Sequence, residues 1–351
     1  MKINLFGNFK EENRTSMDNY ADDHLYFLKK YSSNDINSII PKFNNFFGQN
    51  NLGFRLNRYF FYPQLVKKIQ FADVAHIVDH QYAHLVKYIN SKIKIITVHD
   101  LIPEIFSKFL KKKPYLLRYS LKHLKYFDKI IATSKNTKTD IMKYTDCSEN
   151  KIKVLYQTAK DFFNTASINK LDVMKNFNLP IEPIKILITG KNFYKNTETS
   201  LKILTKLLEK NINVIFVHLG GEQLNYLHKN KIFKINHCSK EDVARLYKVI
   251  DILLFPSLYE GYGMPCLEAM LSGVPIVCSK NSSIHEIVGD AALMCDAENV
   301  DCFVNNIIQL LNNKNLYNQK KQQGIERAKI FIDAENYTKD LVNIYQDLLK
   351  I

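Results

Sequence analysis

Residues 255–270 read FPSLYEGYGMPCLEAM, a glycine-containing loop that runs directly into a helix and carries two glutamates, Glu260 and Glu268. Backbone N–H groups at a helix start bind phosphate, and the helix dipole favours negative charge at that end. Carboxylates accept hydrogen bonds from sugar hydroxyls. The stretch therefore predicts a site for a ligand that contains both phosphate and sugar, which is the chemistry of a nucleotide sugar.

On both sides of this stretch, short apolar runs alternate with longer amphipathic segments, a pattern that predicts right-handed βαβ units and parallel sheets. The strands expected in the first half are residues 2–6, 74–78, 93–98 and 129–132. Those expected in the second half are residues 184–188, 213–218, 231–235, 252–255 and 274–277. Two such series predict an α/β protein with two Rossmann-like, doubly wound parallel-sheet domains.

The expected domain boundary falls in residues 161–178, which are largely polar and lack a strand. We predict a first domain at residues 1–165, a second at 166–333, and a C-terminal helix at 334–351 that packs back on the first domain. Ligands bind at the carboxyl ends of parallel strands in such sheets. We therefore expect the site in a central cleft that both sets of strand ends face.

The formal net charge of +14 is concentrated in the first half of the chain. Residues 1–170 contain 28 Lys and Arg against 15 Asp and Glu, a balance of +13, which leaves +1 for residues 171–351. Such an asymmetry suggests that one half meets an anionic partner, and nucleic acid, an anionic membrane surface and a phosphate-bearing acceptor are the candidates. A general lysine bias of the sequence is the alternative explanation.

The cysteine pattern and the first residues indicate an intracellular protein. The six cysteines form no Cys-x-x-Cys pair, and their spacing fits neither a zinc site nor a disulfide framework, so we expect six reduced thiols. Residues 1–6 have the pattern of a strand and lack the apolar region of a secretion signal. No apolar run reaches the length of about 20 residues that spans a bilayer. We expect a cytoplasmic protein, peripheral at the inner membrane face.

A second anion-binding pattern follows the first strand of the second half. Gly190 lets a phosphate approach the backbone, and Lys191 and Lys195 can neutralise a diphosphate. One glycine and two lysines are a weak signal in a lysine-rich chain. The pattern gains weight because the Glu260–Glu268 stretch lies in the same half.

The second half resembles the retaining glycosyltransferases of family 4, the group 1 glycosyl transferases with the GT-B fold. The segments that carry the resemblance are ARLY (244–247), DILLFPSLYEGYGMP (251–265), LEAM (267–270), SGVPIV (272–277), SS (282–283) and EIVGDAA (286–292). The first half agrees more loosely, through HDLIP (99–103) and IIATS (130–134). Many members have a Gly-Gly pair after the first strand, whereas this chain has Gly7-Asn8-Phe9.

The resemblance implies a role for each candidate residue of the second half. Glu268 would accept hydrogen bonds from the ribose, and Lys191 and Lys195 would stabilise the departing nucleoside diphosphate. Glu260 and the backbone of the following loop would hold the transferred sugar and its phosphate. The loop residues are Gly261, Tyr262, Gly263 and Met264.

In the first half, the resemblance implies that His99 touches the donor sugar. Gly7 and Asp79 follow predicted strands and are the other substrate-binding candidates there. The departing phosphate is thought to take the acceptor's proton in enzymes of this type, so the protein supplies positioning and charge and not a strong base. Lysines would supply the positive charge, and the chain has no Asp-x-Asp triplet. We therefore expect no metal and no cofactor, with the nucleotide sugar as co-substrate.

Residues 106–127 are basic and amphipathic, a composition that suits either an interfacial helix on an anionic leaflet or an ordinary surface helix. Pro114 interrupts the segment, so two helices are expected. We consider this segment the candidate for a peripheral membrane contact.

The resemblance, together with the residues above, implies a metal-independent, retaining hexosyltransferase. It would move a hexosyl unit from a nucleotide sugar to a glycan or lipid-linked acceptor in surface polysaccharide or lipopolysaccharide synthesis, with a weak preference for mannose from GDP-mannose. UDP- or GDP-linked glucose, GlcNAc or galactose are alternative donors, and a nucleotide-sugar epimerase is an alternative reaction. A nucleic-acid-binding protein is the alternative of another class, although the basic residues accompany no recognition module, and we expect no nucleic acid partner.

Overall fold

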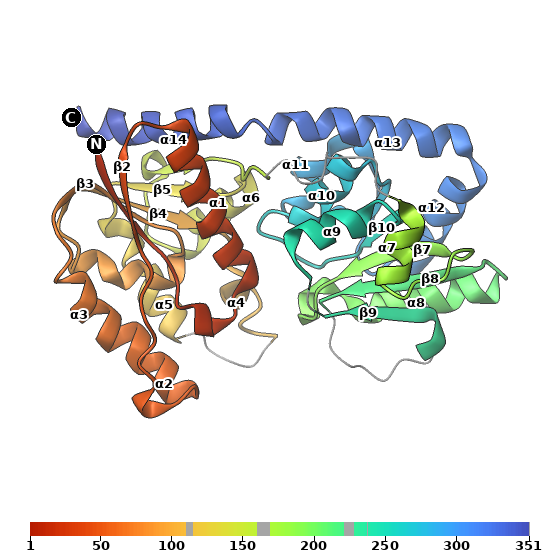
Figure 1. The fold of residues 1–351 in the computed structure, drawn as a ribbon, viewed down its shortest axis with the longest axis horizontal. Helices are drawn as coiled ribbons and strands as arrows, with labels where there is room; N and C mark the ends of the chain where they lie inside the picture. Colours follow the sequence, from red (N-terminus) through yellow and green to blue (C-terminus); the bar gives the residue numbers. More distant parts are fainter. Residues whose placement is uncertain (110–114, 160–168, 221–227, 237, 351) are drawn as a thin grey trace. The chain divides into compact units, whose positions relative to one another are not determined.

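The computed structural model describes residues 1–109, 115–159, 169–220, 228–236 and 238–350, and Figure 1 shows its fold. The chain forms two compact units. Unit 1 comprises Met1–Thr158 together with Asp333–Ile351, and unit 2 comprises Ala159–Ile332. The last helix therefore belongs to the same unit as the first strand.

Unit 1 contains a six-stranded parallel sheet in the order β2-β1-β3-β4-β5-β6. Its strands are β1 (Lys2–Phe6), β2 (Asp35–Ile39), β3 (Ala72–Ile77), β4 (Ser91–Val98), β5 (Lys129–Ala132) and β6 (Ile152–Val154). Its α-helices are α1 (Thr15–Tyr31), α2 (Asn51–Leu56), α3 (Tyr62–Val66), α4 (Ile102–Ile105), α5 (Tyr115–Leu121), α6 (Lys135–Tyr144) and α14 (Ala334–Leu349).

Unit 2 contains a second six-stranded parallel sheet in the order β12-β11-β10-β7-β8-β9. Its strands are β7 (Ile184–Thr189), β8 (Val214–Leu219), β9 (Ile232–Ile235), β10 (Ile252–Phe255), β11 (Ile276–Ser279) and β12 (Ala292–Cys295). Its α-helices are α7 (Lys170–Asn176), α8 (Thr197–Glu209), α9 (Lys240–Tyr247), α10 (Met264–Ser272), α11 (Ile284–Val288), α12 (Val300–Asn312) and α13 (Lys314–Ala328).

The strands that the sequence analysis missed all lie at sheet edges. β2 and β6 border the sheet of unit 1, and β12 borders that of unit 2. β2 has the sequence DINSI, and two of its five residues are exposed. An edge strand pairs on one side, so it buries less apolar surface and shows a weaker hydrophobic pattern.

The sheet of unit 1 is covered on both faces because neighbouring side chains of a strand point in opposite directions. Ile96 packs in one buried cluster and Ile95 in the other. The second cluster includes Leu341 and Tyr345 of α14. The Tyr345 hydroxyl lies 2.6 Å from Nδ1 of the buried His76 on β3, so a polar contact also fixes this helix to the sheet.

The basic segment 106–127 is divided into short elements. α4 ends at Ile105, α5 covers Tyr115–Leu121, and a 3₁₀ turn, η5, covers Leu124–Tyr126. Pro114 and its four preceding residues lie outside the described part of the chain. Within the described ranges, no helix has both the length and the apolar character needed to cross a bilayer.

Candidate functional site

The centre of the candidate site is an ion pair between Lys195 and Glu260. The Lys195 Nζ donates to Glu260 Oε1 across 2.8 Å, and both side chains are largely buried. Lys195 ends the 3₁₀ turn η8 (Phe193–Lys195) after β7, and Glu260 follows β10. Because β7 and β10 are neighbours in the sheet, their carboxyl ends bring together residues that are 65 positions apart.

Gly190 makes room for the Lys195 side chain. A Cβ on Gly190 would lie 2.9 Å from Lys195 Cγ, and the glycine has a φ of +80°. The Nζ of Lys195 also lies 5.0 Å from the centroid of the Phe255 ring. Gly190 was predicted to let a phosphate approach the backbone closely, and the structure gives this glycine a second role. Lys191, in contrast, is an exposed residue.

Asn196 connects the turn that carries Lys195 to the loop after β10 that carries Glu260. Its Nδ2 donates to the backbone oxygens of Pro256, at 3.0 Å, and Ala297, at 2.9 Å. The backbone N–H of Leu258 donates to the Tyr194 oxygen across 2.7 Å. These bonds hold Lys195 and Glu260 on one rigid frame. The sequence pattern predicts no role for Asn196, because its hydrogen-bond partners come from distant parts of the chain.

Two serines fix the loop from Glu260 to Gly263. Ser282 Oγ accepts from the Glu260 N–H at 2.8 Å. Ser283 Oγ lies 2.9 Å from the carbonyl oxygens of both Glu260 and Tyr262. Both serines belong to the family-like pattern, although no function was predicted for either of them.

The loop ends at α10, whose start has the character expected for anion binding. Gly263 is the N-cap residue with a φ of +105°, and Met264 and Pro265 open the helix. No acidic residue lies in this first turn. The helix dipole at this end therefore meets no negative side chain of its own first turn.

Glu268 lies further along α10 and is half-buried. The Tyr247 hydroxyl on α9 lies 3.2 Å from Glu268 Oε2 and 3.1 Å from the Pro265 oxygen. Burial raises the pKa of Glu268 to about 7, and the hydrogen bond from Tyr247 opposes this rise. Tyr247 was part of the family-like sequence pattern, but its contact with Glu268 is visible only in the fold.

We expect Tyr247→Phe to move the pH dependence of nucleotide binding. In the wild type, the hydrogen bond from Tyr247 stabilises the ionised carboxylate of Glu268. Without that bond, the pKa of Glu268 should rise further, by about one pH unit. An ionised Glu268 is the better acceptor for ribose hydroxyls, so affinity should fall as pH drops through this pKa. Calorimetric titration with GDP and with UDP across the neutral range would place the fall at higher pH in the variant.

Tyr317→Phe is the matched control for this prediction. The Tyr317 hydroxyl donates to the Asp251 oxygen at 2.9 Å, so the control also loses one tyrosine hydrogen bond in unit 2. It should keep the wild-type pH profile. Identical profiles for all three proteins would contradict the role of Tyr247.

The candidates of the first half lie in unit 1, where their side chains have partners within the same unit. His99 is buried, with Nε2 at 2.8 Å from the Val78 oxygen and Nδ1 at 3.0 Å from Gln157 Nε2. Burial lowers the pKa of His99, which favours the neutral ring. Its contact with a donor sugar stays a prediction.

Asp79 is fully buried and forms an ion pair with Arg14. Its Oδ1 also accepts from the Gln81 N–H at 2.9 Å. Burial alone would raise the pKa of Asp79, but the Arg14 guanidinium and neighbouring groups outweigh it and leave that pKa lowered. Since the carboxylate has these internal partners, a direct substrate contact by Asp79 stays a prediction.

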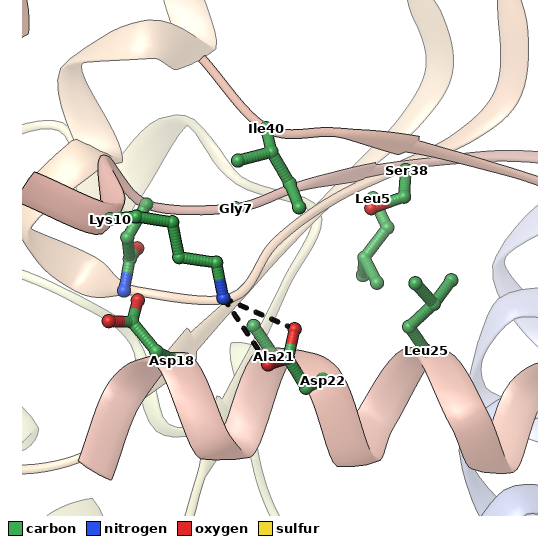
Figure 2. Close-up of a pocket in the computed structure, with 10 residues that line it drawn as sticks. Leu5, Gly7, Lys10, Asp18, Ala21, Asp22, Leu25, Ser38 and Ile40 are labelled. Carbon is green, nitrogen blue, oxygen red and sulfur yellow. Dashed lines mark hydrogen bonds and ion pairs between the residues drawn. The ribbon is translucent and has the colours of Figure 1, made fainter. Parts of the chain in front are cut away.

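Gly7 lines a small pocket between β1, β2 and α1 (Figure 2). The Gly7 oxygen accepts from the Tyr62 hydroxyl at 2.8 Å. Across the pocket, Lys10 Nζ lies 3.2 Å from an oxygen of Asp22. The structure therefore places Gly7 beside charged side chains, and its assignment to substrate binding stays a prediction.

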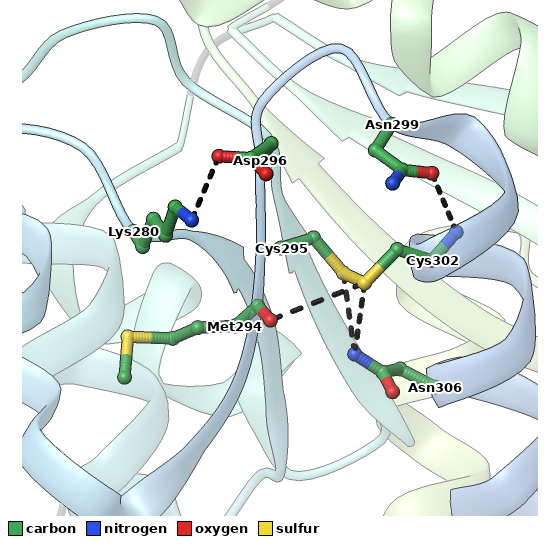
Figure 3. The surroundings of a disulfide bond; sticks show 7 residues. All are labelled: Lys280, Met294, Cys295, Asp296, Asn299, Cys302 and Asn306. Carbon is green, nitrogen blue, oxygen red and sulfur yellow. Dashed lines mark hydrogen bonds and ion pairs between the residues drawn. A yellow bond between two sulfur atoms is a disulfide. The ribbon is translucent and has the colours of Figure 1, made fainter.

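The prediction of six reduced thiols was wrong for two cysteines. Cys295 at the end of β12 and Cys302 in the first turn of α12 form a disulfide, with Cα atoms 5.9 Å apart (Figure 3). The turn between them, in which Asn299 accepts from the Cys302 N–H at 3.0 Å, brings the strand end and helix start together. Cys147, Cys238, Cys266 and Cys278 are free.

Comparison with known proteins gives one family match and a set of distant relatives. Residues 170–327 match the family model described as glycosyl transferases group 1. O-antigen chain mannosyltransferase B of Escherichia coli is 38% identical over 112 residues, which are 32% of this chain and 29% of that protein. O-antigen chain mannosyltransferase RfbU of Salmonella typhimurium is 27% identical over 230 residues, 61% of each chain.

Among solved structures, sucrose-phosphate synthase from Thermosynechococcus elongatus superposes with a TM-score of 0.80 at 14% identity. The match covers 100% of this chain and 99% of that one, and at this identity it shows the fold alone. The chain spans less than two thirds of the length of the first curated relatives that it matches.

Proposed function

We propose that the protein is a glycosyltransferase, because residues 170–327 match the family model described as glycosyl transferases group 1 and the chain has the GT-B fold. It transfers a hexosyl unit from a nucleotide sugar to a glycan or lipid-linked acceptor. The observation that carries this proposal is the buried Lys195–Glu260 pair beside the start of α10, with Glu268 further along the same helix.

In the proposed reaction, Lys195 and Lys191 stabilise the charge that develops on the leaving diphosphate. Glu260 and the N-terminal end of α10 hold the sugar and its phosphate, and Glu268 accepts from the ribose. A contact of His99 with the donor sugar is also part of the proposal. The protein thus contributes position and charge, while the departing phosphate takes the acceptor's proton and the sugar keeps its anomeric configuration.

We further propose that the reaction needs no divalent ion. Ammonium groups at the carboxyl end of β7 provide the positive charge that a metal supplies in other transferases. The fold would be the same with or without a metal ion, since this proposal concerns only which group neutralises the charge of the diphosphate.

Mannose, from GDP-mannose, is the proposed sugar. Two of the relatives, from Escherichia coli and Salmonella typhimurium, are O-antigen chain mannosyltransferases. Their names support a place in surface polysaccharide or lipopolysaccharide synthesis. A position at the inner face of a membrane is a separate part of the proposal. Residues 106–127, basic and with the exposed Tyr115 and Tyr119 on α5, are the segment first proposed for membrane contact.

The test is a panel of nucleotide sugars with EDTA present, in which binding and slow release of the nucleoside diphosphate are measured. We expect one donor to bind and to be hydrolysed by the wild type. Glu268→Ala should weaken its binding about tenfold to a hundredfold, since hydrogen bonds to a charged group contribute about 1.5–3 kcal/mol. Glu209→Ala, which removes an exposed glutamate at the end of α8, should bind as the wild type does.

The other outcomes separate the alternatives. A sugar nucleotide converted to its epimer without diphosphate release would indicate an epimerase. If no donor binds, or if turnover requires a divalent ion, the roles given to Lys191, Lys195 and Glu268 are wrong.

A further inference from the structure

The segment from residue 36 to residue 72 has no acidic residue and five basic ones, Lys42, Arg55, Arg58, Lys67 and Lys68. It includes most of β2, α2 and α3, together with the turn η2 (Asn45–Phe47) and the π-helix η3 (Asn57–Phe61). Arg58 is paired with Glu12, and the four other cations are exposed. The segment therefore presents positive charge to solvent without compensating carboxylates of its own.

The same segment exposes large apolar side chains. Phe46 is 84% exposed, Leu52 58% and Phe60 55%, and Phe47 is also exposed. Figure 1 shows α2 at the end of unit 1 opposite to α14. We call Phe46, Phe47, Leu52 and Phe60 the aromatic tip. The Phe46 and Phe47 rings lie 4.9 Å apart, and large apolar side chains that gather on an exposed surface mark an interaction site.

The aromatic tip is held by an ordered framework. Asn50 caps α2 by accepting from the N–H groups of Leu52, at 3.0 Å, and Gly53, at 2.9 Å. Asn57 is fully buried, and its amide exchanges hydrogen bonds with the backbone of Asn44, at 2.7 and 3.0 Å. The backbone that carries the side chains of the tip is therefore held by side-chain hydrogen bonds, while those side chains are exposed to solvent.

Close packing of two glycines completes this framework. A Cβ on Gly53 would lie 1.9 Å from the Gly48 oxygen, so the loop that carries Phe46 and Phe47 closes directly onto α2. On the inner side, the buried Phe43 ring packs against Phe54 at 5.1 Å between centroids. Some apolar side chains of the segment, such as Phe43, thus pack in the core of unit 1, whereas those of the aromatic tip are exposed to solvent.

The π-helix η3 contacts α5. The Tyr59 hydroxyl of η3 donates to the Leu116 oxygen at 3.4 Å, and the Tyr59 and Tyr119 rings lie 5.9 Å apart. α5 adds two exposed tyrosines, Tyr115 and Tyr119, and belongs to the basic segment 106–127. The aromatic tip and α5 are therefore linked parts of unit 1.

We propose that the aromatic tip inserts into the interface of an anionic lipid bilayer and is the main membrane anchor of unit 1. Aromatic rings suit the headgroup region, where an apolar body meets a polar boundary, and the flanking cations are attracted to anionic lipids. A second copy of this chain is a less suitable occupant, because two such cationic surfaces repel each other.

This inference deepens the proposed function, since anchoring would bring the enzyme to a lipid-linked acceptor. Its test uses no donor or acceptor, so vesicle binding and donor turnover can fail independently. The full chain is sedimented with vesicles of phosphatidylcholine alone and of equal parts phosphatidylcholine and phosphatidylglycerol. The wild type should bind the mixed vesicles, and added salt should weaken that binding.

Two double variants separate the apolar and the electrostatic contributions. Phe46→Ser with Phe47→Ser should lower partitioning onto the mixed vesicles at least roughly tenfold. Lys42→Glu with Arg55→Glu should lower it roughly tenfold or more and should remove the preference for anionic lipid. All four side chains are exposed, so far-UV circular dichroism and urea midpoints should stay those of the wild type.

Matched controls lie in unit 2. Ile181→Ser with Ile330→Ser removes two apolar side chains that are 66% and 62% exposed. Lys229→Glu with Lys314→Glu makes the same charge change on exposed lysines. Both controls should bind vesicles as the wild type does.

The proposal is overturned if the wild type does not bind the mixed vesicles or if the Phe46/Phe47 variant binds them equally well. It is also overturned if the apolar control loses binding to the same extent. The wild type could instead be dimeric in light scattering and fail to bind vesicles, while the Phe46/Phe47 variant is monomeric. That result would assign the surface to contact with a second copy of the chain.

Discussion

Lys195→Ala should lower turnover of the nucleotide-sugar donor by a factor of about 10²–10³, if the lysine acts like other donors that stabilise developing charge. Its Nζ lies 2.8 Å from Glu260 Oε1 in a largely buried setting, where electrostatic interactions are stronger than in water. In the proposed reaction this ammonium faces the leaving diphosphate. Diphosphate release under saturating donor is the measurement, and the loss should appear in kcat.

The variant also leaves Glu260 without its ion-pair partner, and that effect must be separated from catalysis. The double variant Lys195→Ala with Glu260→Gln removes the uncompensated charge, and we expect it to stay as inactive as the single variant. Recovery of turnover would mean that the lysine only neutralises Glu260. Lys202→Ala, which removes an exposed lysine on α8, should leave turnover unchanged.

Tyr345→Ala should destabilise unit 1 by about 3–5 kcal/mol, the usual cost of deleting a buried aromatic ring. The Tyr345 ring is fully buried against β-strands of unit 1, and its hydroxyl lies 2.6 Å from His76 Nδ1. Loss of the ring leaves a cavity, and loss of the hydroxyl leaves a buried imidazole nitrogen without this partner. Urea unfolding followed by far-UV circular dichroism measures the change.

Two variants show which part of the effect is packing. Tyr345→Phe keeps the ring and should lose about 1–3 kcal/mol, the cost of an unsatisfied buried polar group. Asp347→Ala, at an exposed position on the same helix, should be close to neutral. If Tyr345→Ala unfolds at the wild-type urea midpoint, the packing of α14 against the sheet does not contribute measurably to the stability of unit 1.

Hydrophobic patterning predicted the interior of both sheets because interior strands bury both faces. Residues 2–6, 129–132 and 252–255 were predicted as strands and are β1, β5 and β10 with these bounds. The α/β class and the GT-B fold follow from such strands in alternation with helices, together with the family-like segments of the second half.

The sequence could not show which side chains meet. The Lys195–Glu260 pair depends on β7 and β10 being neighbours, and that order is set by tertiary packing. The same holds for the contact of Tyr247 with Glu268, which joins α9 to α10. Asn196 is a further example, because its amide connects the loops after β7, β10 and β12.

By itself, the sequence determined most of the strands and the residue types of the candidate site, because periodicity, glycine positions and local motifs act over a few residues. Tertiary structure decided the partners. It placed Asp79 and His99 in hydrogen bonds within unit 1, joined Cys295 to Cys302, and directed the aromatic tip to solvent. These outcomes depend on contacts between distant segments, and a local pattern carries no information about which distant atoms will fill the space beside it.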